Sequence, residues 1–457
     1  MRVVVVGGGF GGLASAARLA KLGHDVTLLE RLETLGGAVS TVAADGFEWD
    51  AGPTATLLPA VVRDLFRKSG RPLERELGFE LEPLDLVREH WFADGTVVAL
   101  PGHSRAAQRQ AFDTLGAGLG ERWVSYVDSF SDDWEVLRRA YFESAWDPGD
   151  LSREVAARLD SREMLHKRLR RTFKDERLRL VAGHPFVAEG HDLRNVPAWA
   201  GLVSYLERQF GTWTLPGGMG RLSALLTDRL ATRRVTVERG VTATDLIVRS
   251  GRVVAVATAS GQIDADAVVC AVDPRLLPAL APYVERTMPA MPPVICHVGV
   301  ASPVPGLAPE VVLHGNPMLV LRTGGQAPTG GAAYTVHGRG RLAEDILTAL
   351  ARQGIDLRAD LVSRVDETPR DLVERWQSSP YGVLWQGHSA AAARPANPHR
   401  GGVRRRRACH ARCWAAVRRT LRGVGGAGGG SRLRRVSSAG RRNSQLSDQV
   451  TVSIAVS

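Results

Sequence analysis

The first thirty residues combine two short apolar runs with a helical spacing of apolar positions between them. Residues 3–6 are four valines, a pattern typical of a strand that is buried on both faces. Residues 13–22 place small and apolar side chains at helical spacing, and Gly23 follows as the predicted C-cap. Residues 25–29 predict a second strand. The pattern therefore predicts a strand–helix–strand unit.

Downstream, the pattern predicts a helix-rich segment and then a series of strands. Residues 60–205 are helix-rich, with clear helical spacing at 60–66 and 123–127. A helix is predicted over 222–230 and an amphipathic helix over 341–352, with strands over 235–237, 244–248, 253–257 and 267–271. We expect the aromatic side chains scattered through the helix-rich segment to be ordinary core, with an apolar substrate tunnel as the alternative; they are Trp134, Tyr141, Phe142 and Trp146.

A glycine-rich loop joins the first strand to the first helix. Gly7, Gly9 and Gly12 have the spacing Gly-x-Gly-x-x-Gly. In this motif the first glycine permits a tight turn, the second lets the backbone approach a pyrophosphate, and the third lets helix and strand pack closely. The start of the helix presents free N–H groups to such an anion. Glu30 ends the second strand, where a carboxylate can accept hydrogen bonds from a ribose 2′-hydroxyl. These features predict a dinucleotide site and leave FAD and NAD both open.

Three further motifs make the interpretation specific. Residues 35–37 read Leu-Gly-Gly, residues 47–54 read Phe-Glu-Trp-Asp-Ala-Gly-Pro-Thr, and residues 216–219 read Pro-Gly-Gly-Met. These stretches resemble the phytoene desaturase (carotenoid desaturase) branch of the FAD-dependent amine oxidase superfamily, and the resemblance covers residues 1 to about 387. In one departure, Ala38 stands where the family usually has arginine, so a charge-assisted contact near the cofactor is missing or is supplied elsewhere.

The resemblance implies an α/β fold in which a Rossmann-type FAD-binding domain is interleaved with an α+β substrate domain. We expect the FAD-binding domain to comprise residues 1–75 and 211–280, and the substrate domain to comprise 76–210 and 281–387. The resemblance also implies FAD rather than NAD, and oxidation or desaturation of a lipophilic, carotenoid-like substrate by hydride transfer to flavin. A flavin amine oxidase is the alternative enzyme, and a non-catalytic remnant is the alternative of another class.

The predicted cofactor contacts lie at the two glycine loops, at the acid and at one later strand. The resemblance implies that Gly36 and Gly37 lie beside the flavin phosphates and that the backbone of Val241 meets the adenine. The full set is Gly7, Gly9, Phe10, Gly11, Gly12, Glu30, Arg31, Gly36, Gly37 and Val241.

No side chain identifies itself as a catalytic acid or base, and no metal site is predicted. Four histidines show neither metal-ligand spacing nor an obvious carboxylate partner; they are His184, His191, His297 and His337. Cys270 and Cys296 lie in apolar runs, and we expect buried thiols rather than redox or metal roles.

The net charge of +11 comes from one end of the 457-residue chain. Residues 388–457 hold 15 Arg, no Lys and one acid, a net +14, whereas residues 1–387 hold 44 bases and 47 acids, a net −3. The body is thus mildly acidic and long enough for two or three domains. The four cysteines do not suggest a disulfide framework, which fits a cytoplasmic protein.

Residues 388–457 resemble a product of the wrong reading frame. The family's last residues normally return to the FAD domain as a strand, a glycine loop and a helix, and this segment has no such pattern. When the degenerate codons of residues 409–422 are read one nucleotide later, the permitted residues include Ala-Thr-Pro-Gly-Ala-Gly-Leu-Pro-Phe-Val-Gly-Leu-Ser, which is the missing motif. We infer a frameshift close to Gly387, either a sequencing error or a genuine lesion, and we expect weak FAD binding and little or no turnover.

As translated, this basic tail is expected to be disordered. An RNA-binding tail and a zinc site at residues 409–413 are the alternatives for it. We expect a small lipophilic substrate, peripheral membrane contact and no specific nucleic acid. No apolar run approaches 18 residues, and the start is too short and too glycine-rich for a signal peptide.

Overall fold

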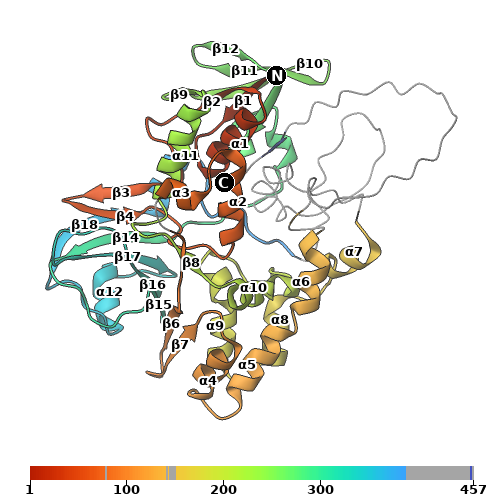
Figure 1. Ribbon diagram of the computed structural model, residues 1–457. Helices are drawn as coiled ribbons and strands as arrows, with labels where there is room; N and C mark the ends of the chain where they lie inside the picture. Colours follow the sequence, from red (N-terminus) through yellow and green to blue (C-terminus); the bar gives the residue numbers. More distant parts are fainter. Residues whose placement is uncertain (78–79, 140–142, 144–150, 388–452, 455–457) are drawn as a thin grey trace.

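The computed structural model describes residues 1–77, 80–139, 143, 151–387 and 453–454 (Figure 1). Their strands form a five-stranded and a seven-stranded sheet, together with smaller sheets. Apart from residues 453–454, the predicted disordered tail at 388–457 lies outside the described residues. Within the described part of the chain, no helix is both long and apolar enough to cross a membrane.

The five-stranded sheet is parallel and has the order β19-β13-β1-β2-β9. Residues 3–6 of β1 are buried because both faces of the sheet are covered, as predicted for a run of valines. The strands are β1 (Arg2–Val6), β2 (Asp25–Leu29), β9 (Thr236–Glu238), β13 (Ala267–Cys270) and β19 (Ser453–Ile454).

Helices cover one face of this sheet, and an antiparallel meander covers the other. On the helical face, Val3 and Val5 share a core with α1 (Phe10–Lys21), α2 (Pro59–Ser69), α3 (Leu73–Leu77) and α11 (Arg221–Thr232). On the opposite face, Val4 and Val6 pack with the strands of the meander, which lies above the sheet in Figure 1. The meander consists of β10 (Ala243–Arg249), β11 (Arg252–Thr258) and β12 (Gly261–Asp264).

The seven-stranded sheet is mixed and has the order β18-β14-β17-β16-β15-β6-β7. Only β15 and β6 pair in parallel within it. One face packs on α12 (Ile346–Arg352) through an apolar cluster. The strands are β6 (Leu86–Phe92), β7 (Val97–Pro101), β14 (Val294–Val300), β15 (Glu310–His314), β16 (Met318–Thr323), β17 (Ala332–Arg339) and β18 (Leu361–Glu367).

A hairpin joins the two sheets. It is formed by β3 (Thr41–Ala44) and β4 (Phe47–Asp50). Phe47 and Trp49 are buried against the seven-stranded sheet, and Trp49 Nε1 donates to the Val298 carbonyl oxygen at 3.2 Å. The hairpin therefore fixes the loop that follows it, residues 51–54, between the two sheets.

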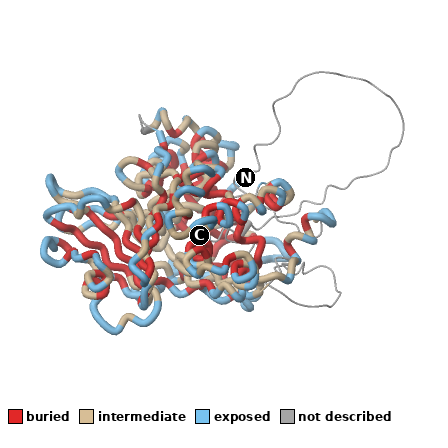
Figure 2. The backbone as a smooth tube through the Cα atoms, turned by 90° about the horizontal axis from the view of Figure 1, so that it is seen from below, coloured by how far each residue is buried: buried red, intermediate tan, exposed pale blue. Residues whose placement is uncertain are grey.

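A group of helices adjoins the seven-stranded sheet and has its own apolar core, which includes Trp134. Figure 2 shows buried residues along the strands and in the interior of the molecule, with exposed residues at the periphery. The helices are α4 (Arg105–Asp113), α5 (Leu119–Asp128), α6 (Ser131–Leu137), α7 (Arg153–Leu159), α8 (Leu165–Thr172), α9 (Glu176–Val187), the 3₁₀ helix Ala198–Gly201 and α10 (Leu202–Phe210). The remaining elements are β5 (Glu82–Pro83), β8 (Trp213–Thr214), α13 (Pro369–Trp376) and the 3₁₀ helices Pro274–Leu276 and Ala281–Tyr283.

The segment 60–205 is helix-rich as predicted, and it also contains the hairpin of β6 and β7, whose turn includes Gly95 with a φ of 81°. Two predicted boundaries were wrong. The helix predicted over 341–352 begins only at Ile346, because the Asp345 side chain accepts hydrogen bonds from the amides of Leu347 and Thr348. The strand predicted over 235–237 lies one residue later.

Candidate functional site

Two glycines of the β1–α1 loop are required by the fold itself. Gly7 has a φ of 103°, and a Cβ there would lie 2.8 Å from the carbonyl oxygen of Ala271. A Cβ on Gly12 would lie 1.9 Å from the carbonyl oxygen of Gly7. Glycine is therefore necessary at both positions whether or not a ligand binds.

Gly9 differs from its two neighbours in the motif. Its φ is −68° and its ψ is 176°, an extended conformation that any residue adopts. A Cβ on Gly9 would meet no atom of the chain closer than the Gly37 Cα at 3.8 Å. Helix α1 begins immediately after Gly9 with no side-chain cap and no acidic residue in its first turn, which contains Phe10, Gly11 and Gly12. The free N–H groups at the start of α1 and the space beside Gly9 suit an anion that approaches the backbone closely.

The second glycine loop lies directly against the first. The Gly36 amide donates to the Gly8 carbonyl oxygen at 2.8 Å. Gly36 and Gly37 have φ values of 116° and 58°, and a Cβ on Gly37 would lie 2.8 Å from the Gly9 Cα. A larger residue at Gly37 would therefore displace the first loop, whereas a Cβ on Gly36 would lie 3.0 Å from the Ser223 side chain of α11.

Glu30 lies at the end of β2 beside both loops. Its Oε2 accepts a hydrogen bond from the Gly8 amide at 2.6 Å, and its Oε1 accepts one from the Leu32 amide at 2.8 Å. A carboxylate has about four acceptor sites, so it keeps capacity for the hydroxyls of a ribose. The Val241 amide donates to the Glu30 carbonyl oxygen at 2.9 Å, which brings Val241 to the same end of the sheet.

Arg31 is placed differently from the other predicted contacts. Its guanidinium donates through Nη2 to the carbonyl oxygen of Arg375 in α13. The structure thus brings nine of the ten predicted residues together around the two loops and turns the side chain of the tenth toward α13.

Asp50 is a site residue to which the sequence interpretation gave no role. Its carboxylate accepts hydrogen bonds from the amides of Met219 at 3.0 Å and Gly220 at 2.8 Å, at the start of α11. Burial raises the pKa of Asp50, while the two amide hydrogen bonds and the charge of Arg322 act in the opposite direction. Asp50 thereby connects the end of β4 to the Pro-Gly-Gly-Met loop. The sequence signal that could have indicated a role for Asp50 was its position in the Asp-Ala-Gly-Pro-Thr motif.

The face of the seven-stranded sheet opposite α12, called the polar face here, carries many polar and charged side chains among apolar ones such as Val312 and Ile295. The strand registers place on this one face Arg88 and His90 of β6, Glu310 and His314 of β15, Arg322 of β16, Thr335 and His337 of β17, His297 of β14 and Glu367 of β18. Helix α9 covers part of it through His184, and α10 covers part through Glu207. Arg322 Nη1 donates to the Gly52 carbonyl oxygen at 3.4 Å, which places this face next to the loop after β4.

An ion network crosses the polar face. Arg88 pairs with both carboxylate oxygens of Glu207 and donates through Nε to Glu310 at 3.0 Å. Arg322 Nε donates to the other oxygen of Glu310 at 3.0 Å. Burial alone would raise the pKa of Glu310, but the hydrogen bond from His184 and the two guanidinium groups lower it well below its ordinary value. The network is therefore ionised and internally paired.

Three of the four histidines considered from the sequence have carboxylate partners, which the sequence interpretation did not find. His184 lies 3.5 Å from Glu310, His297 lies 3.5 Å from Glu367 and His191 lies 3.5 Å from Glu189. The first two partners are distant in sequence, so spacing along the chain could not reveal them. His90 Nδ1 and His314 Nε2 also share a hydrogen bond of 2.8 Å.

Cys270 and Cys296 are buried free thiols, as expected. Burial raises the pKa of Cys270 to about 12 and raises that of Cys296 as well, so neither forms a thiolate at neutral pH. Within the described ranges, no group of three or more His, Cys, Asp or Glu side chains could hold a metal ion. The zinc alternative at residues 409–413 lies outside the described residues.

The chain matches the family described as flavin containing amine oxidoreductase over residues 10–386. The match begins at Phe10, directly after Gly9, and includes the second glycine loop, Glu30, Asp50 and the polar sheet face. The chain belongs to this family.

Curated relatives of the chain include enzymes named for carotenoid substrates. The 4,4′-diapolycopene oxygenase of Methylomonas sp is 24% identical over 445 residues, which cover 84% of this chain and 88% of the oxygenase. The hydroxyneurosporene desaturase of Cereibacter sphaeroides is 31% identical over 286 residues, which cover 60% of this chain and 57% of the desaturase. These identities show a shared family at considerable evolutionary distance.

Solved structures with a similar fold include cyclohexylamine oxidase from Brevibacterium oxydans, with a TM-score of 0.61 and 18% identity over 85% of this chain and 88% of that chain. A fatty acid isomerase from P. acnes has a TM-score of 0.55 and 17% identity over 82% of this chain and 89% of that chain. At such identities the likeness concerns the mixed α/β fold alone.

Proposed function

We propose that the chain binds FAD at the β1–α1 loop and is a desaturase or oxidase of a lipophilic, carotenoid-like substrate. One observation carries the cofactor half of this proposal. Neither the backbone conformation of Gly9 nor the surrounding atoms of the chain require a glycine at this position. By contrast, Gly7 is required by its positive φ and by packing, and Gly12 is required by packing. Close approach of a ligand to the backbone explains the glycine at this position.

The remaining contacts follow from the geometry of the two loops. Free N–H groups at the start of α1, including those of Phe10 and Gly11, would bind the pyrophosphate, and Gly36 and Gly37 would border it. Glu30 would accept hydrogen bonds from the ribose, and the backbone of Val241 would adjoin the adenine. The side chain of Arg31 donates to the carbonyl oxygen of Arg375 in α13. Arg31 therefore belongs to the proposed set only through the position of its backbone.

When bound, the flavin supplies the chemistry, by accepting a hydride from the substrate. The protein positions the substrate and excludes water. Residues 51–54 and the adjoining polar sheet face lie where the two sheets meet, and we propose them as part of the substrate chamber. The domain boundaries given above remain a prediction.

The substrate half of the proposal is supported by the curated relatives, which are named for acyclic carotenoids. The amine oxidases found among the solved structures share the fold and do not favour an amine over a polyene. The proposal also holds that residues 388–457 come from a shifted frame, so that the translated chain retains the ADP-binding loops, binds FAD weakly and turns over little or not at all.

The test compares the translated chain with a frame-restored version. Both are purified and equilibrated with FAD, and bound flavin per chain is measured by absorbance. The loaded proteins are then mixed anaerobically with an acyclic polyene or with a primary amine, and bleaching of the flavin band is followed. We expect flavin reduction by the polyene in the frame-restored chain. Reduction by the amine alone would indicate an amine oxidase, and stoichiometric FAD with normal reduction in the translated chain would overturn the proposed lesion.

A further inference from the structure

One histidine of the polar face is buried without a hydrogen-bond partner. His337 of β17 has only 7% of its surface exposed, and within the described part of the chain neither of its ring nitrogens makes a hydrogen bond. On the same face, His297 shares a hydrogen bond of 3.0 Å with Thr335. A buried polar group without a partner costs free energy, so its presence in a native structure requires an explanation. A ligand atom that completes the hydrogen bonds of His337 provides one.

The neighbours of His337 across the sheet are apolar. Val320 of β16 and Ile295 of β14 lie directly opposite it in the two strand registers. Side chains that are opposite one another on one face of a sheet are the nearest cross-strand neighbours. A hydrogen-bond partner for the imidazole must therefore come from above the sheet.

Tyr381 lies above this part of the sheet. The guanidinium carbon of Arg339, two residues after His337 on the same face of β17, lies 5.4 Å from the centroid of the Tyr381 ring. The charges of Arg322 in β16 and Glu367 in β18 both act on the phenol, so Tyr381 lies over the strands between them, β17 and β14. Tyr381 is half-buried, and its hydroxyl makes no hydrogen bond within the described ranges. A second polar group without a partner thus lies in the region of His337.

Both groups are uncharged at neutral pH. Burial lowers the pKa of His337 well below its ordinary value, and the charge of Arg322 acts in the same direction. Burial raises the pKa of Tyr381, so the phenol keeps its proton. A neutral imidazole has one N–H donor and one acceptor nitrogen, and a phenol both donates and accepts. The two side chains can therefore pair with either a donor or an acceptor.

The charged groups around these two side chains already have counter-charges. The pairs are Arg322 with Glu310, Arg375 with Glu367, and Arg339 with the charge of Glu189. A carboxylate ligand would add a negative charge without a cation of its own, and it would lose its hydration on burial. The unused hydrogen-bonding capacity of the imidazole and the phenol instead suits a neutral oxygen, in a hydroxyl or a carbonyl group.

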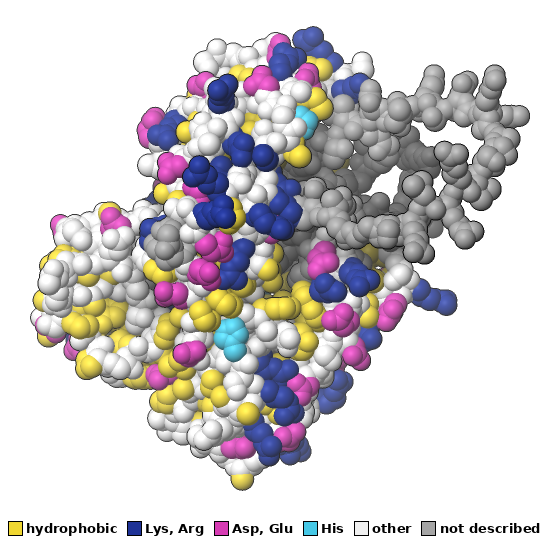
Figure 3. Space-filling view, in the orientation of Figure 1, with side chains coloured by type: hydrophobic (Ala, Val, Ile, Leu, Met, Phe, Trp, Pro, Cys, Tyr) yellow, Lys and Arg dark blue, Asp and Glu magenta, His cyan; other side chains and the backbone are white. Residues whose placement is uncertain are grey.

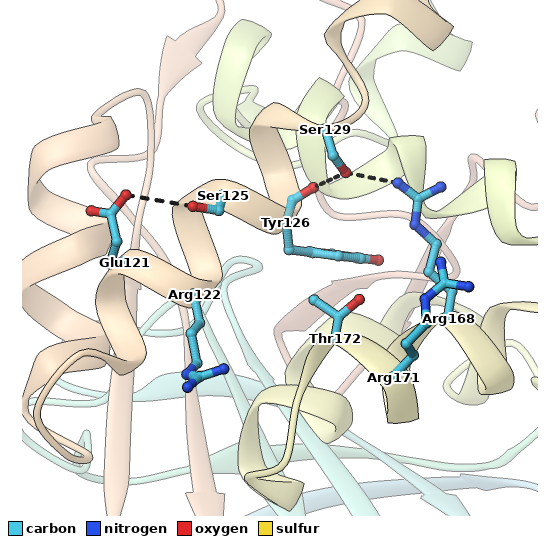
Figure 4. Close-up of a pocket in the computed structure, with 8 residues that line it drawn as sticks. All are labelled: Glu121, Arg122, Ser125, Tyr126, Ser129, Arg168, Arg171 and Thr172. Atoms are coloured by element: carbon cyan, nitrogen blue, oxygen red, sulfur yellow. Dashed lines mark hydrogen bonds between the residues drawn. The ribbon is translucent and has the colours of Figure 1, made fainter.

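The outer surface of the molecule has a different character. Charged side chains of both signs are interspersed on it (Figure 3). A surface cleft of about 420 Å³ lies between α5 and α8, and its arginines Arg122 and Arg168 lie at opposite ends and do not converge (Figure 4). Ser129 in this cleft already accepts a hydrogen bond from Arg168 at 2.7 Å. The uncharged pair on the polar face therefore differs from the ionic groups of the surface.

We infer that His337 and Tyr381 bind a neutral oxygen, in a hydroxyl or a carbonyl group, at one end of the lipophilic substrate. The inference rests on the proposed function, in which the polar face is part of the substrate chamber. A hydroxyl would accept a hydrogen bond from one side chain and donate one to the other, and a carbonyl would accept from both. A site that hydrogen-bonds an oxygen of the substrate discriminates against an analogue without it, because the polar groups of the site then stay unpaired. The two side chains would therefore favour an oxygenated polyene over a pure hydrocarbon.

The experiment measures ligand binding by the full chain, so it requires no turnover. The ligands are conjugated tetraenes of equal chain length that end in a methyl group, a hydroxyl, an aldehyde or a carboxylate, and an increase in tetraene fluorescence reports binding. Tyr381→Phe removes only the hydroxyl, and His337→Phe replaces the imidazole with another planar ring. Tyr205→Phe in α10 is the matched control, because Tyr205 is also half-buried and its hydroxyl also lacks a hydrogen bond among the described residues.

We expect the alcohol and the aldehyde to bind at least about tenfold more tightly than the hydrocarbon, since each would make two hydrogen bonds. Tyr381→Phe and His337→Phe should each weaken binding of these two ligands about fivefold or more and leave the affinity for the hydrocarbon unchanged. The control should stay within about twofold of the original chain for every ligand.

Two kinds of failure are distinguishable in this experiment. Equal affinity for the alcohol and the hydrocarbon, tighter binding of the carboxylate than of the alcohol, or unchanged affinities in both Tyr381→Phe and His337→Phe would overturn the inference alone. The proposed lipophilic substrate would stand in each of these cases. Binding of none of the four tetraenes would overturn both the inference and the substrate half of the proposed function.

Discussion

At the scale of single residues, the three glycines of the motif have different reasons to be glycine. Gly12 is fixed by packing, because a Cβ there would overlap the Gly7 carbonyl oxygen at 1.9 Å. Gly9 has room for a Cβ and an ordinary conformation. A sequence motif does not separate these two reasons, and the structure does.

This difference predicts that two alanine substitutions change stability by very different amounts. Gly12→Ala should lower the free energy of unfolding by about 3 kcal/mol or more, because the backbone of β1 must move. Gly9→Ala should change it by less than about 1 kcal/mol. Urea unfolding of both variants without added flavin measures the difference. Equal destabilisation by the two substitutions would contradict the packing described here.

Asp50 offers a second test at this scale. In Asp50→Asn, one amide N–H of the α11 start would face the side-chain NH₂ instead of an oxygen. We expect a loss of about 1–3 kcal/mol in the free energy of unfolding, the cost of an unsatisfied buried donor. Asp228→Asn, at an exposed position of the same helix, is the control and should have little effect. A neutral Asp50→Asn would show that Asp50 does not cap α11.

At the scale of elements, the amino-terminal strand–helix–strand unit and the helix near 222–230 were predictable because their patterns are local. Each signal in the amino-terminal unit depends on only a few neighbouring residues. The signals are four consecutive valines, a helical spacing of apolar positions, and Gly23 with a φ of 89° at the end of the helix. The polar sheet face was not predictable. It is assembled from six strands between Leu86 and Glu367, and alternation within one strand does not reveal which side chains meet across the sheet. The pairs His184–Glu310 and His297–Glu367 are examples.

The buried histidines of this face predict a dependence of stability on pH. Burial lowers the pKa of His90, His184 and His337 below the ordinary value, and it lowers the pKa of His314 to about 3. In the unfolded chain these groups titrate near about 6.5, so below that pH the unfolded state binds more protons than the folded state. Stability conferred by the neutral histidines is therefore present above pH 6.5 and is lost as the pH falls.

Each such histidine contributes a slope of about 1.4 kcal/mol per pH unit below its unfolded pKa. We expect urea midpoints to fall steeply between about pH 6.5 and 5. His314→Gln should reduce the slope by the contribution of about one proton, and His24→Gln, at a partly exposed position outside the sheet, is the control. A midpoint that is constant across this range would contradict the burial of neutral histidines.

At the scale of the whole molecule, segments distant in sequence build each sheet. The parallel sheet takes strands from residues 2–29, 236–270 and 453–454, and the mixed sheet takes strands from 86–101 and 294–367. Strand patterns alone do not specify which distant segments share a sheet. The sequence also assigned the charge imbalance to residues 388–457, and the family match ends at residue 386, close to the inferred frameshift.

The frameshift makes a prediction about the whole chain. Restoring the frame near residue 387 should raise the flavin bound per chain several-fold and raise the thermal midpoint in the presence of FAD, because a ligand that binds only the folded state stabilises it. Differential scanning fluorimetry with and without FAD measures both chains in parallel. If the restored chain binds no more flavin than the translated chain, the missing carboxy-terminal motif is not part of the flavin site.

The central claim is that the β1–α1 loop binds the ADP half of FAD beside Gly9. The most direct measurement is the affinity of the translated chain for FAD, followed by quenching of flavin fluorescence, with ADP as a competitor and Gly9→Ala as the variant. We predict weak binding that ADP displaces and that Gly9→Ala weakens at least about tenfold while the unfolding midpoint is unchanged. FAD binding that ADP does not displace, or equal affinity in Gly9→Ala, would contradict the claim.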